Sequence, residues 1–289
     1  MTINIRKGDA VPLDFCVIGE QKCATTWLYY NLKDNKRLLL GESKEQRLFF
    51  GMNDDFFAEV SNSSNKVCGE ITPDYLTCGN LMAPRLYAHN PKMKIIVMLR
   101  DPIDRAASQF RMQKTFSGEC FRVLNKMNFH EAFMQGYPKD TFHDWGVKHL
   151  GINGPLGIGS MMRRSQYAGN ILEFKRLFGD KNILIILQDE VTSCPEEVLR
   201  RVSDFIGVEY WPVKSSHRIV RPLDVRVRRV DITSDDYSHL VEYLDPEKKK
   251  VERMIGRELS WLQAELQQSV KIRTSLTKGI KKCIKKLFE

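Results

Sequence analysis

The chain alternates between short apolar runs and longer amphipathic segments. Three runs have the length and continuous apolar character of strands buried in a parallel sheet: Phe15 to Ile18, Lys94 to Leu99 and Asn182 to Leu187. Segments with apolar residues three and four positions apart predict helices, and the clearest of these end at Gly179 and Gly207. Strands that alternate with helices indicate an α/β fold, in which helices flank a central parallel sheet.

Composition narrows the class of protein and of partner. An apolar share of 42% and a charged share of 28% are typical of a globular protein. A net charge of +9 indicates an anionic partner, such as a nucleotide, a nucleic acid, a sulfated or phosphorylated glycan, or a membrane surface. The scattered cysteines form no C-x-x-C pair, so we predict reduced thiols and no metal site. Reduced thiols are typical of the cytoplasm, and a luminal catalytic fragment without its anchor is the alternative.

The stretch from Asp14 to Leu32 contains the first candidate site. Its apolar run ends at Gly19, and a helical pattern opens at Thr25. A strand, a turn of small residues and a helix bind anions well, because the turn amides and the positive end of the helix dipole point at the ligand. Lys22 adds a positive charge at a spacing that differs from a Walker A motif, in which Lys directly precedes Ser or Thr. A solvated strand-to-helix turn is the alternative interpretation.

A second candidate site follows the strand predicted over Lys94 to Leu99. Arg100 stands where that strand ends, a Pro turn follows, and a helix is predicted to open at or near Asp104. Ligands of open α/β sheets bind at the carboxyl ends of the strands. Arg100 would offer a planar fork of donors to a phosphate, and Ser108, one turn into the helix, would add a hydroxyl.

Together the two segments resemble the motifs of sulfotransferases that use 3′-phosphoadenosine-5′-phosphosulfate (PAPS). In that family the 5′-phosphosulfate loop has the approximate sequence motif G-x-x-K-x-G-T-T-x-L. This chain has Ala24 at the position where Gly is usual. The added methyl group is tolerated if this residue has a negative φ and is costly otherwise. The 3′-phosphate motif, R-D-P-x-x-R-x-x-S-x-[FY], is filled at every signature position, with Arg105 as a candidate ion-pair partner. The resemblance assigns the cofactor contacts to Lys22, Cys23, Ala24, Thr25, Thr26, Arg100 and Ser108.

The resemblance also implies two catalytic roles. Lys22 would neutralise the charge that develops on the leaving phosphate. In heparan-sulfate-type sulfotransferases, a K-E-x-x-x-F-F segment carries a Glu that resembles a general base, and Glu45 occupies that position here. A solvated Glu in a charged loop is the alternative for Glu45.

Four residues are candidates for contacts with the acceptor. Glu70 and Tyr75 match the family's E-x-[ST]-P-x-Y segment, for which a turn with Tyr75 in the core is the alternative. Arg163 and Tyr167 lie in a basic, aromatic part of the chain that suits an anionic or sugar acceptor. The cytosolic small-molecule class usually uses a His base, and no His matches it here. A glycan or glycolipid acceptor is therefore favoured over a small-molecule or lipid alcohol.

The resemblance covers residues 12–262, for which we predict one P-loop-like, three-layer sulfotransferase domain. In residues 263–289 the segment from Lys271 to Phe288 places apolar residues on one helical stripe and lysines around it. A basic amphipathic helix is typical of an anchor on an anionic membrane surface or of a partner-binding helix, and a helix packed on its own domain is the alternative. We therefore expect a cytoplasmic protein or one peripheral at the inner membrane face.

The resulting prediction is an enzyme that moves the sulfuryl group of PAPS to a hydroxyl or amine, with no metal and no nucleic acid partner. A P-loop kinase-like nucleotide-binding protein would share the strand–loop–helix unit, but the chain lacks G-K-[ST] and carries a 3′-phosphate motif. A non-enzymatic basic membrane adaptor would explain the charge but not two phosphate motifs in order.

Overall fold

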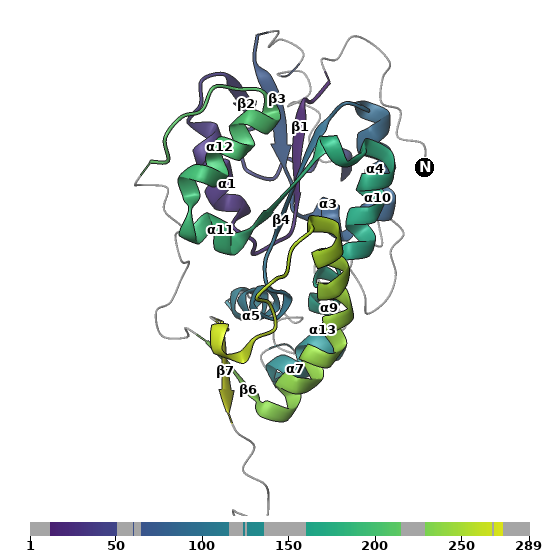
Figure 1. Cartoon of the computed structure of the whole chain (residues 1–289), viewed down its shortest axis with the longest axis vertical. Helices are drawn as coiled ribbons and strands as arrows, with labels where there is room; N and C mark the ends of the chain where they lie inside the picture. The colour runs from purple at the N-terminus through teal and green to yellow at the C-terminus, as the bar shows by residue number, and fades with distance from the viewer. Residues whose placement is uncertain are drawn as a thin grey trace, which may run out of the picture.

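A five-stranded parallel sheet forms the centre of the structure, in the order β2-β3-β1-β4-β5. The computed structural model describes residues 12–50, 60, 65–115, 124, 126–135, 160–214, 229–267 and 269–273. The strands of the sheet are β1 (Phe15–Gly19), β2 (Leu38–Leu40), β3 (Val67–Ile71), β4 (Lys94–Leu99) and β5 (Ile183–Leu187). Helices flank this sheet (Figure 1), so the predicted α/β class is confirmed.

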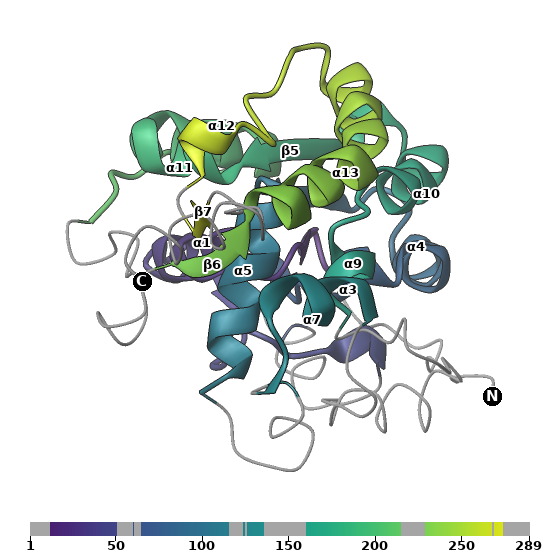
Figure 2. The ribbon, with the colours of Figure 1, turned by 90° about the horizontal axis from the view of Figure 1, so that it is seen from below.

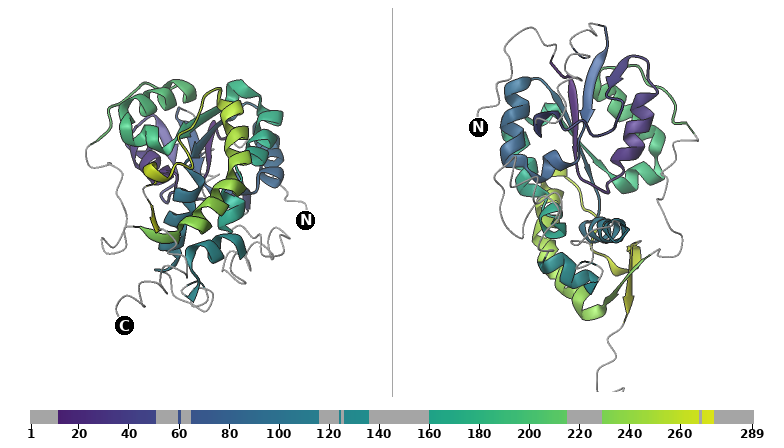
Figure 3. Two further views of the ribbon diagram at one scale, coloured as in Figure 1. Left: turned by 60° about the horizontal axis from the view of Figure 1, so that its bottom comes forward. Right: turned by 180° about the vertical axis from the view of Figure 1, so that it is seen from behind.

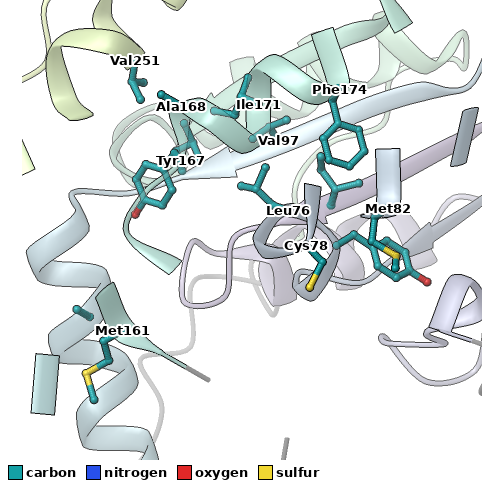
Figure 4. Packing of buried hydrophobic residues seen from close by; sticks show 14 of the residues in the cluster. Leu76, Cys78, Met82, Val97, Met161, Tyr167, Ala168, Ile171, Phe174 and Val251 are labelled. Atoms are coloured by element: carbon teal, nitrogen blue, oxygen red, sulfur yellow. The ribbon is translucent and has the colours of Figure 1, made fainter. Parts of the chain in front are cut away.

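The two faces of the sheet carry separate hydrophobic cores, because successive side chains of a strand point to opposite faces. Ile95 and Val97 of β4 pack in one core, and Ile96 and Met98 pack in the other. Figure 3 shows the resulting layers from two sides, and Figure 4 shows Val97 within the first core. The helices against the sheet are α1 (Thr25–Lys33), α11 (Gln188–Ser193) and α12 (Pro195–Ile206) on one face, and α4 (Gly79–His89) and α10 (Ala168–Phe178) on the other.

Further elements lie beyond the carboxyl ends of the strands, where α5 stands among α7, α9 and α13 (Figure 2). The 3₁₀ turn η2 (Asp180–Asn182) instead directly precedes β5, at its amino end. The elements beyond the carboxyl ends are α3 (Asp74–Thr77), α5 (Pro102–Gln113), α7 (Phe129–Gln135), α9 (Met161–Arg164), α13 (Ser234–Ile255), β6 (Val230–Thr233) and β7 (Val270–Arg273), with 3₁₀ turns η1 (Leu48–Phe50) and η4 (Ala264–Leu266). These elements cover the edge of the sheet at which the predicted site residues lie.

Helix α5 begins at Pro102, two residues before the predicted start at Asp104. The carboxylate of Asp101 accepts hydrogen bonds from the amides of Ile103 (2.9 Å) and Asp104 (3.1 Å). Pro is favoured in the first turn because its missing N–H would have no partner there. The turn after β4 is therefore the cap of the helix itself, and Arg100 directly precedes it.

The start of the predicted C-terminal helix is wrong, because Lys271 to Arg273 lie in strand β7. This strand pairs in parallel with β6, with Val230 opposite Val270 and Ile232 opposite Ile272. Apolar and exposed residues alternate along both strands, and the backbone pairing with β6 outweighs the helical spacing. Residues 274–289 lie outside the described chain, so their role at a membrane surface stays a prediction. Within the described chain, no helix is both long and apolar enough to span a bilayer.

Candidate active site

The predicted phosphate motifs meet at the carboxyl edge of the sheet. Lys22 follows β1, Glu45 follows β2 and Arg100 follows β4. Because β1 and β4 are parallel neighbours, the segments that leave them start side by side, and the amide of Glu20 donates to the carbonyl of Met98 at 2.5 Å. Tertiary structure thus unites residues that the sequence keeps far apart.

The loop between β1 and α1 presents the amino end of a helix to this edge. Thr25 opens α1 and is buried, whereas Thr26 is exposed. No side chain of the described residues caps α1, so its first amides point outward as an anion site. Ala24 and Lys22 have φ angles of 67° and 71°, in the left-handed region. Between them, burial raises the pKa of the Cys23 thiol to about 12, which excludes a thiolate at neutral pH.

Four cations gather around the loop. Burial, followed by the charges of Arg100, Arg111 and Lys44, lowers the pKa of Lys22 to about 8. Lys22 is therefore mainly protonated at pH 7 and loses its proton as the pH rises through 8. A bound anion would relieve the repulsion between these cations and favour the charged form of Lys22. The repulsion between these cations therefore favours the binding of an anion such as a phosphate or sulfate group.

The guanidinium groups of Arg100 and Arg111 meet at one hydroxyl. Their Nη2 atoms lie 3.0 and 3.1 Å from Oγ of Ser269, and Arg100 also lies 3.7 Å from the carboxylate of Asp104. Ser108 is half-buried on the same helix, four residues after Asp104 and three before Arg111, so the three share one face of α5. The sequence analysis missed Arg111, although its spacing from Ser108 signals it. It also missed Ser269, for which no local pattern exists.

Glu45 lies among cations at the same edge. Its carboxylate pairs with Nζ of Lys44 at 2.6 Å and with Nη2 of Arg47 at 3.3 Å, and its side chain is 30% exposed. Lys44 also acts on the pKa of Lys22, so the candidate base and the phosphate loop lie in one electrostatic neighbourhood. This placement suits a carboxylate that receives a proton from an incoming acceptor.

A buried ionic network supports the loop from below. Arg164, the neighbour of Arg163 in the sequence, is buried and pairs with the carboxylates of Glu20 and Asp74. Burial opposes its charge, yet these carboxylates hold the pKa of Arg164 above its usual value. Arg47 lies 3.6 Å from Asp74 and also contacts Glu45. Alternating charges therefore connect the phosphate loop to the candidate base.

Glu70 and Tyr75, predicted to contact the acceptor, lie in the interior. Oε1 of Glu70 accepts hydrogen bonds from the hydroxyls of Thr72 (2.7 Å) and Tyr75 (2.9 Å) and from the amide of Leu48 (3.1 Å). The hydroxyl of Tyr75 accepts from the amide of Phe49 at 3.0 Å. Both side chains are buried, which favours the structural interpretation of this segment. They hold the loop that follows Glu45.

Tyr167 and Arg163 are also engaged with the protein itself. Tyr167 is buried, and its hydroxyl donates to the carbonyl of Arg100 at 2.9 Å, which positions the end of β4. Arg163 is half-buried and its Nε donates to the carbonyl of Thr77 at 3.4 Å. Of the four predicted acceptor contacts, Arg163 alone retains partial exposure.

Arg105, the second arginine of the 3′-phosphate motif, forms hydrogen bonds where we expected an ion pair. It is fully buried, and its guanidinium donates to Oε1 of Gln109 (2.7 Å), to the carbonyl of Met161 (2.7 Å) and to Oγ of Ser165 (2.9 Å). These contacts join α5 to α9. Arg105 therefore stabilises the frame of the site, and Arg100 remains the arginine that faces it.

Metal-ligating side chains do not gather anywhere in the part of the chain that the structure describes. The described residues at this edge of the sheet combine several cations with the carboxylate of Glu45. A model of the sulfotransferase domain family matches residues 12–220. This chain belongs to the sulfotransferase domain family. The match confirms the resemblance that the two phosphate motifs suggest.

Sulfotransferases also stand among the most similar individual proteins. The membrane-associated sulfotransferase kil1 of Dictyostelium discoideum is 22% identical over 86% of this chain and 66% of its own length. The bifunctional heparan sulfate N-deacetylase/N-sulfotransferase 4 of Mus musculus is 28% identical over 67% of this chain and 22% of its own length. The chain thus spans less than two thirds of these relatives. A crystal structure of a sulfotransferase from Alicyclobacillus acidocaldarius has a TM-score of 0.65 at 21% identity, over 86% of this chain and 98% of that one, which supports the fold.

Ala24 provides a first prediction, because its φ of 67° carries the steric cost that a negative φ would avoid. Ala24→Gly should raise the free energy of unfolding by about 1 kcal/mol, since Gly adopts this conformation without that cost. Urea unfolding measures the change. Ala132→Gly, inside helix α7, is the control and should lower stability. An unchanged or less stable Ala24→Gly protein would contradict the prediction.

Glu70 provides a second prediction, concerning pH. Burial raises the pKa of its carboxyl from 4.5 to about 7, so between these values the native state holds a proton that the unfolded state has lost. Stability should therefore fall as the pH rises from 4.5 to 7, by about 3 kcal/mol for this group. In Glu70→Gln this part of the fall should disappear. Urea unfolding at pH 5 and pH 8 tests this, with the exposed Glu173→Gln as control; an unaltered pH dependence in Glu70→Gln would refute it.

Proposed function

We propose that this chain transfers the sulfuryl group of PAPS to a hydroxyl or amine of a glycan or glycolipid. The observation that carries the proposal is the cluster of Lys22, Arg100 and Arg111 beside the uncapped amino end of α1. Two anion-binding elements at one edge suit a nucleotide with phosphates at both its 5′ and its 3′ positions. Membership of the sulfotransferase domain family supports this choice of donor.

The loop between β1 and α1 would bind one phosphate of the donor, and the residues after β4 would bind the other. The loop amides, Thr25 and Thr26 would hold the 5′-phosphate at the amino end of α1, where the helix dipole favours negative charge. Arg100 and Ser108 would hold the 3′-phosphate through a guanidinium fork and a hydroxyl. Lys22 lies near Arg100 and Arg111, whose charges act on its pKa, so it would be close to both phosphates.

Transfer would then need one base and one cation. Glu45 would accept the proton of the acceptor hydroxyl as the new S–O bond forms. Lys22 would neutralise the negative charge that the bridging oxygen gains as its bond to sulfur breaks. The buried network through Asp74 would keep the base and the loop at a constant separation. Each role follows from the position of the side chain at the edge of the sheet.

The acceptor class rests on charge and on the relatives. The net charge of +9 suits an anionic or sugar acceptor. The names of the mouse relative and of the human heparan sulfate glucosamine 3-O-sulfotransferase 6, 29% identical over 48% of this chain and 35% of its own length, refer to heparan sulfate. A small-molecule or lipid alcohol is the second candidate acceptor. We further propose a cytoplasmic or membrane-surface location, with residues 274–288 as the membrane contact.

Donor binding is the first test of the proposal. In calorimetric titration, the wild-type chain should bind 3′-phosphoadenosine-5′-phosphate (PAP) at least tenfold more tightly than ADP. Arg100→Ala should weaken PAP roughly 10–150-fold, because it removes hydrogen bonds to a charged group, and should leave ADP within twofold. Arg176→Ala, an exposed arginine on α10, is the control. Equal affinity for PAP and ADP in the wild type would favour the kinase-like alternative.

Transfer itself is the second test. Labelled PAPS is supplied with heparosan, de-N-sulfated heparan sulfate, a glycolipid or a phenol, and label in the acceptor is counted. Glu45→Gln should lower kcat by roughly 100-fold or more while PAP affinity stays within twofold, because the base acts on the acceptor. Glu42→Gln, an exposed residue of the same loop, is the control. Label transfer at the wild-type rate by Glu45→Gln would remove Glu45 from the mechanism, and no transfer to any acceptor would favour the adaptor.

A further inference from the structure

Two buried carboxylates hold the segment after α13 against the amino end of α5. Oδ2 of Asp101 accepts hydrogen bonds from the amide of Leu262 (2.6 Å) and from Nε2 of Gln267 (3.1 Å). Oδ1 of Asp104 accepts from the amide of Ser269 at 2.7 Å. The segment thus has defined positions on both sides of Gln267. It lies outside residues 12–220, the part that the family model matches.

The hydroxyl of Ser269 has an O–H donor for which the described residues provide no acceptor. A serine hydroxyl has two acceptor lone pairs and one O–H donor. Arg100 and Arg111 both donate to Oγ of Ser269, at 3.0 and 3.1 Å, which occupies the two lone pairs. No described residue accepts a hydrogen bond from its O–H, although Ser269 is 3% exposed. A buried O–H favours a hydrogen-bond acceptor, and between two guanidinium groups an acceptor with negative charge forms the strongest contacts.

Positive charge predominates among the described residues nearest this hydroxyl. Arg100 and Arg111 act unfavourably on each other, and both act unfavourably on Lys22. Asp104 lies against Arg100, attracts Arg111 and also accepts from the amide of Ser269, so one carboxylate faces two guanidinium groups at this point. An anion that enters here gains from the cations and from the free O–H at once.

We propose that Ser269 and Arg111 bind the 3′-phosphate of the nucleotide together with Arg100. This inference rests on the proposed function, since it names residues of the same donor site. A phosphate dianion accepts the O–H of Ser269 and the guanidinium N–H groups on either side of it. The segment beyond the matched domain therefore contributes to the selectivity for a 3′-phosphorylated nucleotide, because contacts with Asp104 and with the amide of Val230 hold Ser269 beside the two arginines.

Calorimetric titration of the full chain with PAP and with ADP tests this inference. Ser269→Ala should weaken PAP about tenfold and Arg111→Ala about 30-fold, as expected for hydrogen bonds to a charged group. ADP, which lacks a 3′-phosphate, should bind each variant within twofold of wild type. Ser269→Thr keeps the hydroxyl and should keep PAP within threefold. Ser203→Ala removes a buried hydroxyl of α12, which donates to Leu199, and should leave both ligands unchanged.

The outcomes separate this inference from the proposed function. Wild-type protein that binds PAP and ADP equally would overturn the donor assignment and the inference together. Wild-type preference for PAP that Arg100→Ala abolishes and Ser269→Ala leaves intact would overturn the inference alone. Tighter PAP binding by Ser269→Ala would show that the hydroxyl competes with the phosphate, and an equal loss of PAP and ADP would show a structural role. Each of these two results would also overturn the inference that Ser269 and Arg111 bind the 3′-phosphate.

Discussion

The parallel pairing of β1 with β4 is the constraint on which the site depends. Cys16 lies opposite Ile95 and Val17 opposite Ile96, so both strands reach the same edge of the sheet. In an antiparallel pair, one of the two connections would leave from the opposite end, and the two phosphate motifs could not meet. Parallel strands bring every following connection to one edge, which is where open α/β sheets bind ligands. The anion site is thus a result of topology before it is a result of any single side chain.

Charge is arranged in two contrasting parts around that edge. On the buried side of the loop between β1 and α1, Arg164 lies between Glu20 and Asp74, so each of these charges has an opposite partner. A buried ion pair often adds little net stability, because desolvation offsets the attraction, but its geometry is strongly specified. On the other side of this loop, the positive charges of Lys22, Arg100 and Arg111 repel one another. The buried ion pairs hold the frame, and the mutually repelling cations would attract an anionic ligand.

The E-x-[ST]-P-x-Y segment acts on the candidate base from a distance. Glu70 accepts from the amide of Leu48, the hydroxyl of Thr72 accepts from the amide of Arg47 at 3.3 Å, and Tyr75 accepts from the amide of Phe49. Three consecutive amides after Glu45 are therefore bound by side chains from the end of β3 and from the residues that follow it. A carboxylate that must meet a small acceptor group benefits from such a supporting frame, because its loop loses little freedom when the acceptor binds.

The sequence by itself predicted strands β1, β4 and β5, the helices that end at Gly179 and Gly207, and the candidate phosphate-binding positions that follow the strand ends. Lys22, Arg100 and Ser108 were predictable because each lies a short, regular distance from the end of an apolar run. The burial of Arg164 was not predictable. Its partner Glu20 is far away in the sequence, and only the fold brings the two residues together. Lys271 to Arg273 fit a helical pattern and form a strand, because pairing with β6 is a long-range contact that local spacing does not contain. Ser269 likewise lies against Arg100 because the segment beyond α13 folds back onto Asp101 and Asp104, a long-range arrangement that only the tertiary structure decided.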